Sequence, residues 1–280
     1  MFTCQLRGRL KRGPARGDLV AVGDLVVFSP IGVRQGVIEE VCPRTSELAR
    51  LAPTPRGVYR QVLLANIDQI VIVFACAQPE PHLRMLDRFL VICEKQHIPP
   101  LIIANKVDLT GLPVAQLIFD RYTPLGYDVL FASTLNGEGI DALRLRLSGK
   151  VSGLVGPSGV GKSSLLNAVQ PELGLKVSRI SEITEKGRHT TAVREMFILS
   201  GGGYVADLPG LRSLALWDTY PEELDGYFPE LRDLVAYCQF GDCTHRDEPG
   251  CAVRTAVSDG RVHMERYTSY LRMRFGDEER

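Results

Sequence analysis

Short apolar runs alternate with turn-forming residues over the first 62 residues of the chain. Runs typical of β-strands cover residues 2–10, 19–28, 36–41 and 59–64, and a stretch of prolines and charged residues at 43–57 separates the last two. Short strands without a helical period must pair or close on themselves to hide their edges. The pattern therefore predicts an all-β barrel of the OB-fold kind.

From residue 65 onward the pattern changes to alternating strands and helices. Continuous apolar runs at 70–77 and 100–104, with further strands at 128–131 and 151–155, are typical of buried parallel strands. Apolar residues at helical spacing separate the first two runs: Leu83, Leu86, Phe89, Leu90 and Cys93. A second helix is expected at 140–147. This alternation predicts a doubly wound α/β sheet, in which ligands bind at the carboxyl ends of the strands.

Residues 156–163 match the phosphate-loop pattern G-x-x-x-x-G-K-[ST] at every defined position. Glycines in this strand-to-helix turn let the backbone N–H groups wrap around phosphates at a helix N-terminus. We predict that Lys162 contacts the β and γ phosphates and that the Ser163 hydroxyl binds Mg²⁺. A glycine-rich turn that matches by accident is the alternative. The predicted nucleotide contacts are Gly156, Pro157, Ser158, Gly159, Val160, Gly161, Lys162, Ser163 and Ser164.

Two motifs at strand ends predict a guanine site. The first, N-K-x-D, comprises Asn105, Lys106, Val107 and Asp108. Asp108 can accept from the adjacent N1–H and N2–H₂ donors of guanine, whereas adenine would leave the carboxylate unpaired. Asn105 is expected at the N7/O6 edge and the Lys106 stem against the base, with a capped turn as the alternative. Ser133 and Thr134 occupy a loop that resembles the S-A-K base loop of GTPases.

A further phosphate-side motif is D-x-x-G, which runs from Asp207 to Gly210 after a short apolar run. The aspartate can hold a Mg²⁺-bound water, and the Gly210 N–H can meet the γ phosphate. Residues 187–191, between the two phosphate motifs, read Gly-Arg-His-Thr-Thr. We predict that Thr191, or Thr190 in its place, completes the Mg²⁺ shell, with an ordinary polar loop as the alternative.

Water activation needs a residue that ordinary GTPases do not use. They place a glutamine directly after D-x-x-G, but this chain has Leu211 there, which offers no hydrogen-bonding group. His189 is the nearest candidate, because an imidazole can accept a proton or align water near neutral pH. We predict His189 as the catalytic residue, with stabilisation of its own loop as the alternative.

The order of the motifs is circularly permuted. Ordinary GTPases begin with the phosphate loop and end with N-K-x-D and S-A-K, whereas here the two base motifs come first. Strand-end loops assemble the same site wherever the chain begins, so the site survives the permutation. D-x-x-G now leads directly into the C-terminal part, and loss of the γ phosphate can pull on that part.

The C-terminal part carries a metal-ligand pattern, C-x₄-C-x-H-x₅-C, formed by Cys238, Cys243, His245 and Cys251. Three thiolates and one imidazole complete a tetrahedral set without an open position, which predicts structural zinc. Three incidental buried cysteines beside a histidine are the alternative. Helices are expected at 221–236 and 262–273. The remaining cysteines are expected to be small core residues: Cys4, Cys42, Cys76 and Cys93.

The amino-acid composition limits which partners and which cellular compartment are expected for the chain. Lys+Arg and Asp+Glu number 33 each, so no global field draws the chain to nucleic acid. A local basic cluster near the N-terminus is either an RNA contact or a solvated strand face: Arg7, Arg9, Lys11, Arg12 and Arg16. No apolar run approaches about 18 residues and no signal-peptide profile is present, so we expect a cytoplasmic protein without membrane contact.

Together these motifs resemble the RsgA type of circularly permuted GTPase, the ribosome small-subunit-dependent family, over essentially the whole chain. The resemblance implies an OB-fold RNA-binding domain at 1–62, a permuted GTPase domain at 63–215 and an α-helical zinc domain at 216–280. It also implies contact with 16S rRNA and a role in late maturation of the 30S subunit. GTP hydrolysis to GDP would be slow alone and accelerated by 30S, driving release. A monomer is expected.

Two other classes of function remain as alternatives. One is a phosphate-loop ATPase or kinase acting on a small molecule, which Asp108 argues against because adenine cannot pair with it. The other is a non-enzymatic RNA-binding protein that keeps the nucleotide as a structural ligand. GTP turnover in the presence and absence of 30S subunits separates these classes.

Overall fold

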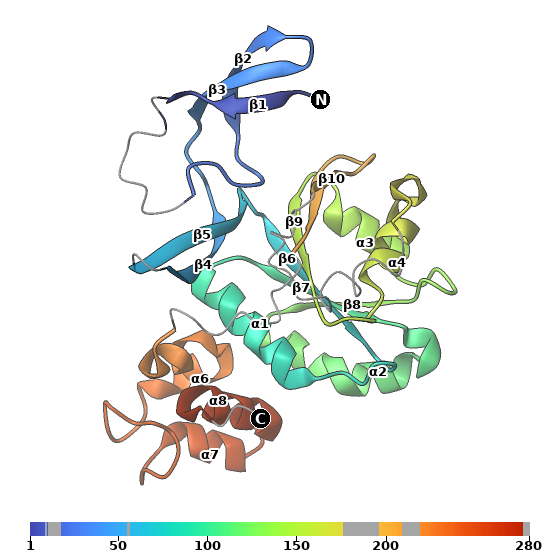
Figure 1. The fold of residues 1–280 in the computed structure, drawn as a ribbon. Helices are drawn as coiled ribbons and strands as arrows, with labels where there is room; N and C mark the ends of the chain where they lie inside the picture. Colours follow the sequence, from blue (N-terminus) through green and yellow to red (C-terminus); the bar gives the residue numbers. More distant parts are fainter. Residues whose placement is uncertain (9, 11–17, 55–56, 176–195, 209–218, 277–280) are drawn as a thin grey trace.

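The computed structural model describes residues 1–8, 10, 18–54, 57–175, 196–208 and 219–276. Within them, an all-β N-terminal part lies above a central α/β part, and a helical C-terminal part packs beside the latter (Figure 1). Among the described helices, none combines the length and the apolar character needed to cross a membrane.

Where the structure describes the N-terminal part, it is built from the strands β1 to β5 and is all-β as predicted. β1 (Thr3–Leu6), β3 (Gln35–Val41) and β2 (Val26–Gly32) make one sheet in that order, with β1 parallel and β2 antiparallel to β3. β4 (Glu47–Thr54) and β5 (Gly57–Ala65) make an antiparallel hairpin below it (Figure 1). The hairpin connects the N-terminal sheet to the central part of the chain.

Two of the strand predictions in this region were wrong. β4 lies inside the stretch 43–57, which was predicted to be a connection, yet Leu48 is fully buried in the central core. Prolines and charged residues around Leu48 interrupt the alternation of apolar and polar residues from which a strand is predicted. Of the stretch predicted as a strand at 19–28, only the last three residues belong to β2. The residues before them do not, because Asp24 holds a turn there and pairs with Arg44, with Nε and Oδ1 2.7 Å apart.

A six-stranded sheet forms the central part, in the order β10-β11-β9-β6-β7-β8. Its strands are β6 (Gln69–Ala75), β7 (Pro100–Asn105), β8 (Asp128–Ala132), β9 (Val151–Val155), β10 (Met196–Ile198) and β11 (Tyr204–Asp207). Neighbouring strands are parallel, except that β10 runs antiparallel at the edge. Every residue of β6 is buried, as the continuous apolar run predicted.

Helices cover both faces of this sheet (Figure 1). They are α1 (Leu83–Gln96), η2 (Val107–Leu109), α2 (Leu112–Phe119), η3 (Asp120–Leu125), α3 (Ile140–Leu147), α4 (Lys162–Val169) and η4 (Pro171–Leu173). Ile72 of β6 packs with Leu86 of α1 in one core cluster, and its neighbour Val73 packs with Leu143 of α3 in the other. Successive β6 side chains therefore serve opposite faces, which confirms the doubly wound prediction.

The described residues of the C-terminal part form the helices η6 (Pro221–Tyr227), α6 (Pro229–Val235), α7 (Ala252–Ser258) and α8 (Met264–Phe275). The single helix predicted at 221–236 is split at Phe228, which is extended at φ −110° and ψ 101°. Pro229 follows it, and the residue before a proline is pushed out of the helical region. Phe228 and Tyr270 share a core cluster with Val91 of α1, so this part packs directly on the central domain.

Candidate functional site

The phosphate loop joins β9 to α4, as the sequence predicted. Gly156 has φ 144°, and a Cβ there would lie 2.2 Å from the backbone oxygen of Val73. Only glycine fits so close to a neighbouring strand. The Lys162 ammonium donates to the carbonyl oxygens of Gly156 at 2.8 Å and Pro157 at 2.7 Å, so it lies across the loop. These residues form the cradle expected for phosphates.

Asp207 ends β11, the strand next to β9, and therefore lies beside the phosphate loop. Burial raises the pKa of Asp207 above its ordinary value, while the positive charge of Lys162 and the Leu208 N–H oppose the rise. A carboxylate at the edge of a phosphate cradle suits an ion or an ion-bound water. The neighbouring Ser163, in the first turn of α4, is buried at 5% exposure.

The two base motifs meet at the ends of β7 and β8. Ser133 Oγ donates to Asp108 Oδ1 and accepts from the Leu135 N–H at 3.2 Å. Among the described residues, none donates a hydrogen bond to the other carboxylate oxygen of Asp108. Thr134 in the same loop is exposed, and Val107 of the N-K-x-D motif is buried at 1% exposure.

Asn105 joins the base site to the phosphate site. Its side chain is 1% exposed, and its Nδ2 donates to the Val160 carbonyl at 2.8 Å. Its Oδ1 is buried and has no hydrogen-bond partner among the described residues. The N-K-x-D motif predicted this amide at the guanine N7/O6 edge. The hydrogen bond to the phosphate loop was not predicted from the sequence.

Lys106 makes a second connection between the two sites. It has a left-handed backbone, with φ 63°, and its ammonium donates to the Gly159 carbonyl at 2.7 Å and to the Gln78 carbonyl. The side chain thereby ties the N-K-x-D loop to the phosphate loop and to the turn that precedes α1. Four predicted site residues lie outside the described residues: His189, Thr190, Thr191 and Gly210.

The four predicted metal ligands come together in the C-terminal part. The ligand atoms of Cys238, Cys243, His245 and Cys251 lie within 4.8 Å of one another. His245 Nδ1 is 3.5 Å from the sulfurs of both Cys238 and Cys251, and those sulfurs are 4.0 Å apart. Tetrahedral zinc places such atoms about 3.5–3.8 Å apart, so the donor set and its size fit a metal.

Side chains around this cluster were not predicted from the sequence. Asp225 Oδ2 lies 3.2 Å from His245 Nε2, an arrangement that fixes the ring and its tautomer. The Glu248 carboxylate accepts from the Thr244 N–H at 2.7 Å and the Arg246 N–H at 3.0 Å. Although burial opposes it, hydrogen bonds from the Thr244 hydroxyl and N–H, together with those from the Glu248 and Asp247 N–H groups, lower the pKa of Glu248 to about 2. An acidic residue between the ligands was the available signal, although Asp242 and Asp247 lie in the same loop.

Comparisons with known proteins agree with this geometry. The family model described as RsgA GTPase matches residues 41–217. The chain belongs to the RsgA GTPase family. A curated relative from Gemmatimonas aurantiaca, named small ribosomal subunit biogenesis GTPase RsgA, is 45% identical over 276 residues, covering 98% of this chain and 89% of the relative. A relative of the same name from Moorella thermoacetica is 41% identical, covering 97% and 88%.

Two solved structures share the fold of this RsgA-family chain. YjeQ from Thermotoga maritima aligns with a TM-score of 0.75 at 36% identity, covering 98% of this chain and 88% of the other. YloQ, described as a circularly permuted GTPase, aligns with a TM-score of 0.70 at 33% identity, covering 100% and 88%. The predicted permuted GTPase fold is thereby confirmed, and the chain is a GTP hydrolase by family.

Proposed function

We propose that this GTPase binds the 30S ribosomal subunit and hydrolyses GTP late in the maturation of that subunit. The hydrogen bond from Asn105 to the Val160 carbonyl best supports the GTPase part of this proposal, because this bond joins a guanine-type motif to a phosphate cradle. The printed name of the curated relatives, small ribosomal subunit biogenesis GTPase, supports the ribosomal role.

GTP is the proposed substrate, bound together with Mg²⁺. The free oxygen of Asp108 would accept hydrogen bonds from guanine. The Lys162 ammonium would donate to phosphate oxygens in place of the carbonyl oxygens of the loop. Ser163 and Asp207 would hold the ion and its water, a role that the position of Asp207 beside Lys162 supports. Mg²⁺ would supply charge neutralisation of the phosphates.

The remaining roles belong to residues 189–191 and to the glycine of D-x-x-G. Thr191, or Thr190, would complete the ion's ligands, and the Gly210 N–H would meet the γ phosphate. His189 would orient the attacking water, because Leu211 cannot. Contact with the subunit would align His189 for this step, so hydrolysis would be slow alone and fast on 30S. The product GDP would permit release of this factor or a partner.

Zinc is the proposed occupant of the Cys238, Cys243, His245 and Cys251 cluster. One ion per chain would be structural, since four protein ligands leave no position for a substrate. The three domains, at 1–62, 63–215 and 216–280, would act together, with the outer two contacting 16S rRNA. We further propose that the chain is monomeric and cytoplasmic.

A turnover assay with GTP and ATP, with and without 30S subunits, tests this function. We expect GTP-specific turnover that 30S subunits accelerate. ATP turnover equal to GTP turnover would overturn the substrate assignment, and GTP turnover unchanged by 30S would overturn the partner. Binding of GTP without hydrolysis under either condition would indicate an RNA-binding protein with a structural nucleotide.

A further inference from the structure

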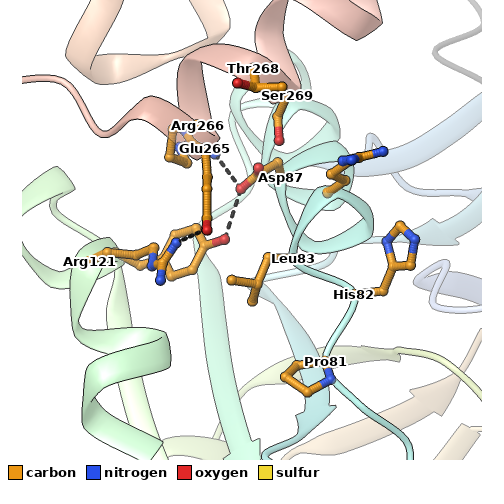
Figure 2. A pocket seen from close by; sticks show the side chains of 11 residues that line it. Pro81, His82, Leu83, Asp87, Arg121, Glu265, Arg266, Thr268 and Ser269 are labelled. Atoms are coloured by element: carbon orange, nitrogen blue, oxygen red, sulfur yellow. Dashed lines mark hydrogen bonds and ion pairs between the residues drawn. The ribbon is translucent and has the colours of Figure 1, made fainter. Parts of the chain in front are cut away.

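A buried charge network joins the central domain to the C-terminal part. Arg266 of α8 is 2% exposed, and its Nη1 donates to Asp87 Oδ1 of α1 at 2.8 Å (Figure 2). Its Nε and Nη2 donate to the two carboxylate oxygens of Glu230 at 2.7 and 3.1 Å. The Tyr122 hydroxyl donates to Asp87 at 2.9 Å. Separating the two parts would leave Asp87 without its cation, which is costly for a buried carboxylate.

One end of this network leads to the nucleotide site. α1 begins at Leu83, one turn before Asp87, and the preceding turn contributes Pro81 and His82 to the pocket beside Arg266 (Figure 2). The Gln78 carbonyl in that turn accepts from the Lys106 ammonium, which also holds the Gly159 carbonyl. A nucleotide that contacts the base and phosphate loops therefore restrains the start of α1.

The other end of the network leads to the metal cluster. Arg266 is followed on α8 by Tyr267, whose hydroxyl donates to the backbone carbonyl of His245. One turn further, the Tyr270 hydroxyl donates to the Thr244 carbonyl at 3.1 Å. Tyr270 is fully buried, with its ring centroid 5.9 Å from that of His245. The position of α8 therefore sets the position of the ligand loop.

We propose that the network of Asp87, Arg266 and Glu230 couples the nucleotide site to the metal cluster, so that bound guanine nucleotide and bound zinc strengthen each other. This inference rests on the proposed function, because it takes both ligands from it. Each ligand restrains one helix of a pair that the network holds in register. Coupling between two sites is reciprocal, so each ligand must raise the affinity of the other by the same factor.

Equilibrium competition for zinc against a chelator of known affinity, with and without GDP, tests the proposal on the full chain. We expect GDP to tighten zinc binding about five-fold or more, the lower end of typical coupling. Titration with GDP should show that zinc-stripped protein binds GDP more weakly than zinc-loaded protein by the same factor. In Asp87→Asn and Arg266→Lys variants the factor should fall toward one. Arg266→Lys keeps every charge but loses the planar fork that reaches both carboxylates, so it decides the test if Asp87→Asn fails to fold.

Arg232→Met is the matched control. Arg232 pairs with Glu94 at the far end of α1 at 3.6 Å, and its side chain is 54% exposed. This variant also removes a cation between the two parts, yet it should keep the full factor. Equal zinc affinity with and without GDP in the unaltered protein would overturn the coupling, and a factor that persists in Arg266→Lys would overturn the route. Failure to bind GDP or zinc at all would instead refute the proposed function.

Discussion

Replacing Asp108 by asparagine should exchange one nucleotide specificity for another. The Ser133 hydroxyl accepts from the Leu135 N–H and donates to Asp108 Oδ1, so it favours an oxygen at that position. In Asp108→Asn the amide oxygen would remain facing Ser133, and the new NH₂ group would face the guanine donors. Xanthine presents an oxygen where guanine presents its amino group, so the variant should prefer xanthosine nucleotides.

The magnitude follows from the number of hydrogen bonds affected. Each buried donor left unpaired costs about 1–3 kcal/mol, and two guanine donors lose their acceptor. The loss is therefore at least about 2 kcal/mol, or roughly 30-fold in affinity. Isothermal titration calorimetry with GDP and xanthosine diphosphate measures both changes, with Asp120→Asn, at an exposed aspartate of η3, as the control. Unchanged GDP affinity in Asp108→Asn would refute the reasoning.

Three further outcomes are expected. Cys243→Ala should lose zinc and unfold the C-terminal part while the central domain still binds GDP; metal analysis and circular dichroism check this, and native protein without zinc would contradict it. His189→Ala should keep GTP and 30S binding but lose most stimulated turnover, and a normal rate on 30S would show that another group positions the water. Glu248→Gln should destabilise the ligand loop. Because folding lowers the Glu248 pKa from 4.5 to about 2, the urea-measured deficit should be full above pH 4.5 and shrink as pH falls toward 2; a constant deficit would exclude the carboxylate charge as its cause.

Local signals in the sequence predicted much of the fold and the motifs of the site. The bounds of α3 and β9 match the predicted 140–147 and 151–155, because a clear apolar period lies between turn residues there. The hairpin strand β4 was missed, since what buries Leu48 is the distant central core. The predicted metal ligands do cluster, because they are close in sequence and share one loop region.

Tertiary contacts explain what the sequence did not predict. Arg266 and Asp87 are 179 positions apart, and neither belongs to a motif. No sequence pattern therefore predicts that they pair. Asp225 likewise reaches His245 from η6, 20 positions earlier in the chain. The bond from Asn105 to Val160 depends on β7 and β9 lying on either side of β6. The roles of His189, Thr190 and Thr191 remain predictions.

The permuted strand order has a consequence for how the chain can fold as it is synthesised. β6 is the first strand of the described central sheet to be made. β7 can join one edge of β6, and β8 can then join the outer edge of β7. β9 joins the opposite edge of β6, and the β10–β11 hairpin then adds beside β9. Each strand therefore docks on a free edge, and none has to be inserted between partners that are already paired. A nascent chain can build the guanine half first and close the nucleotide site when the phosphate loop emerges.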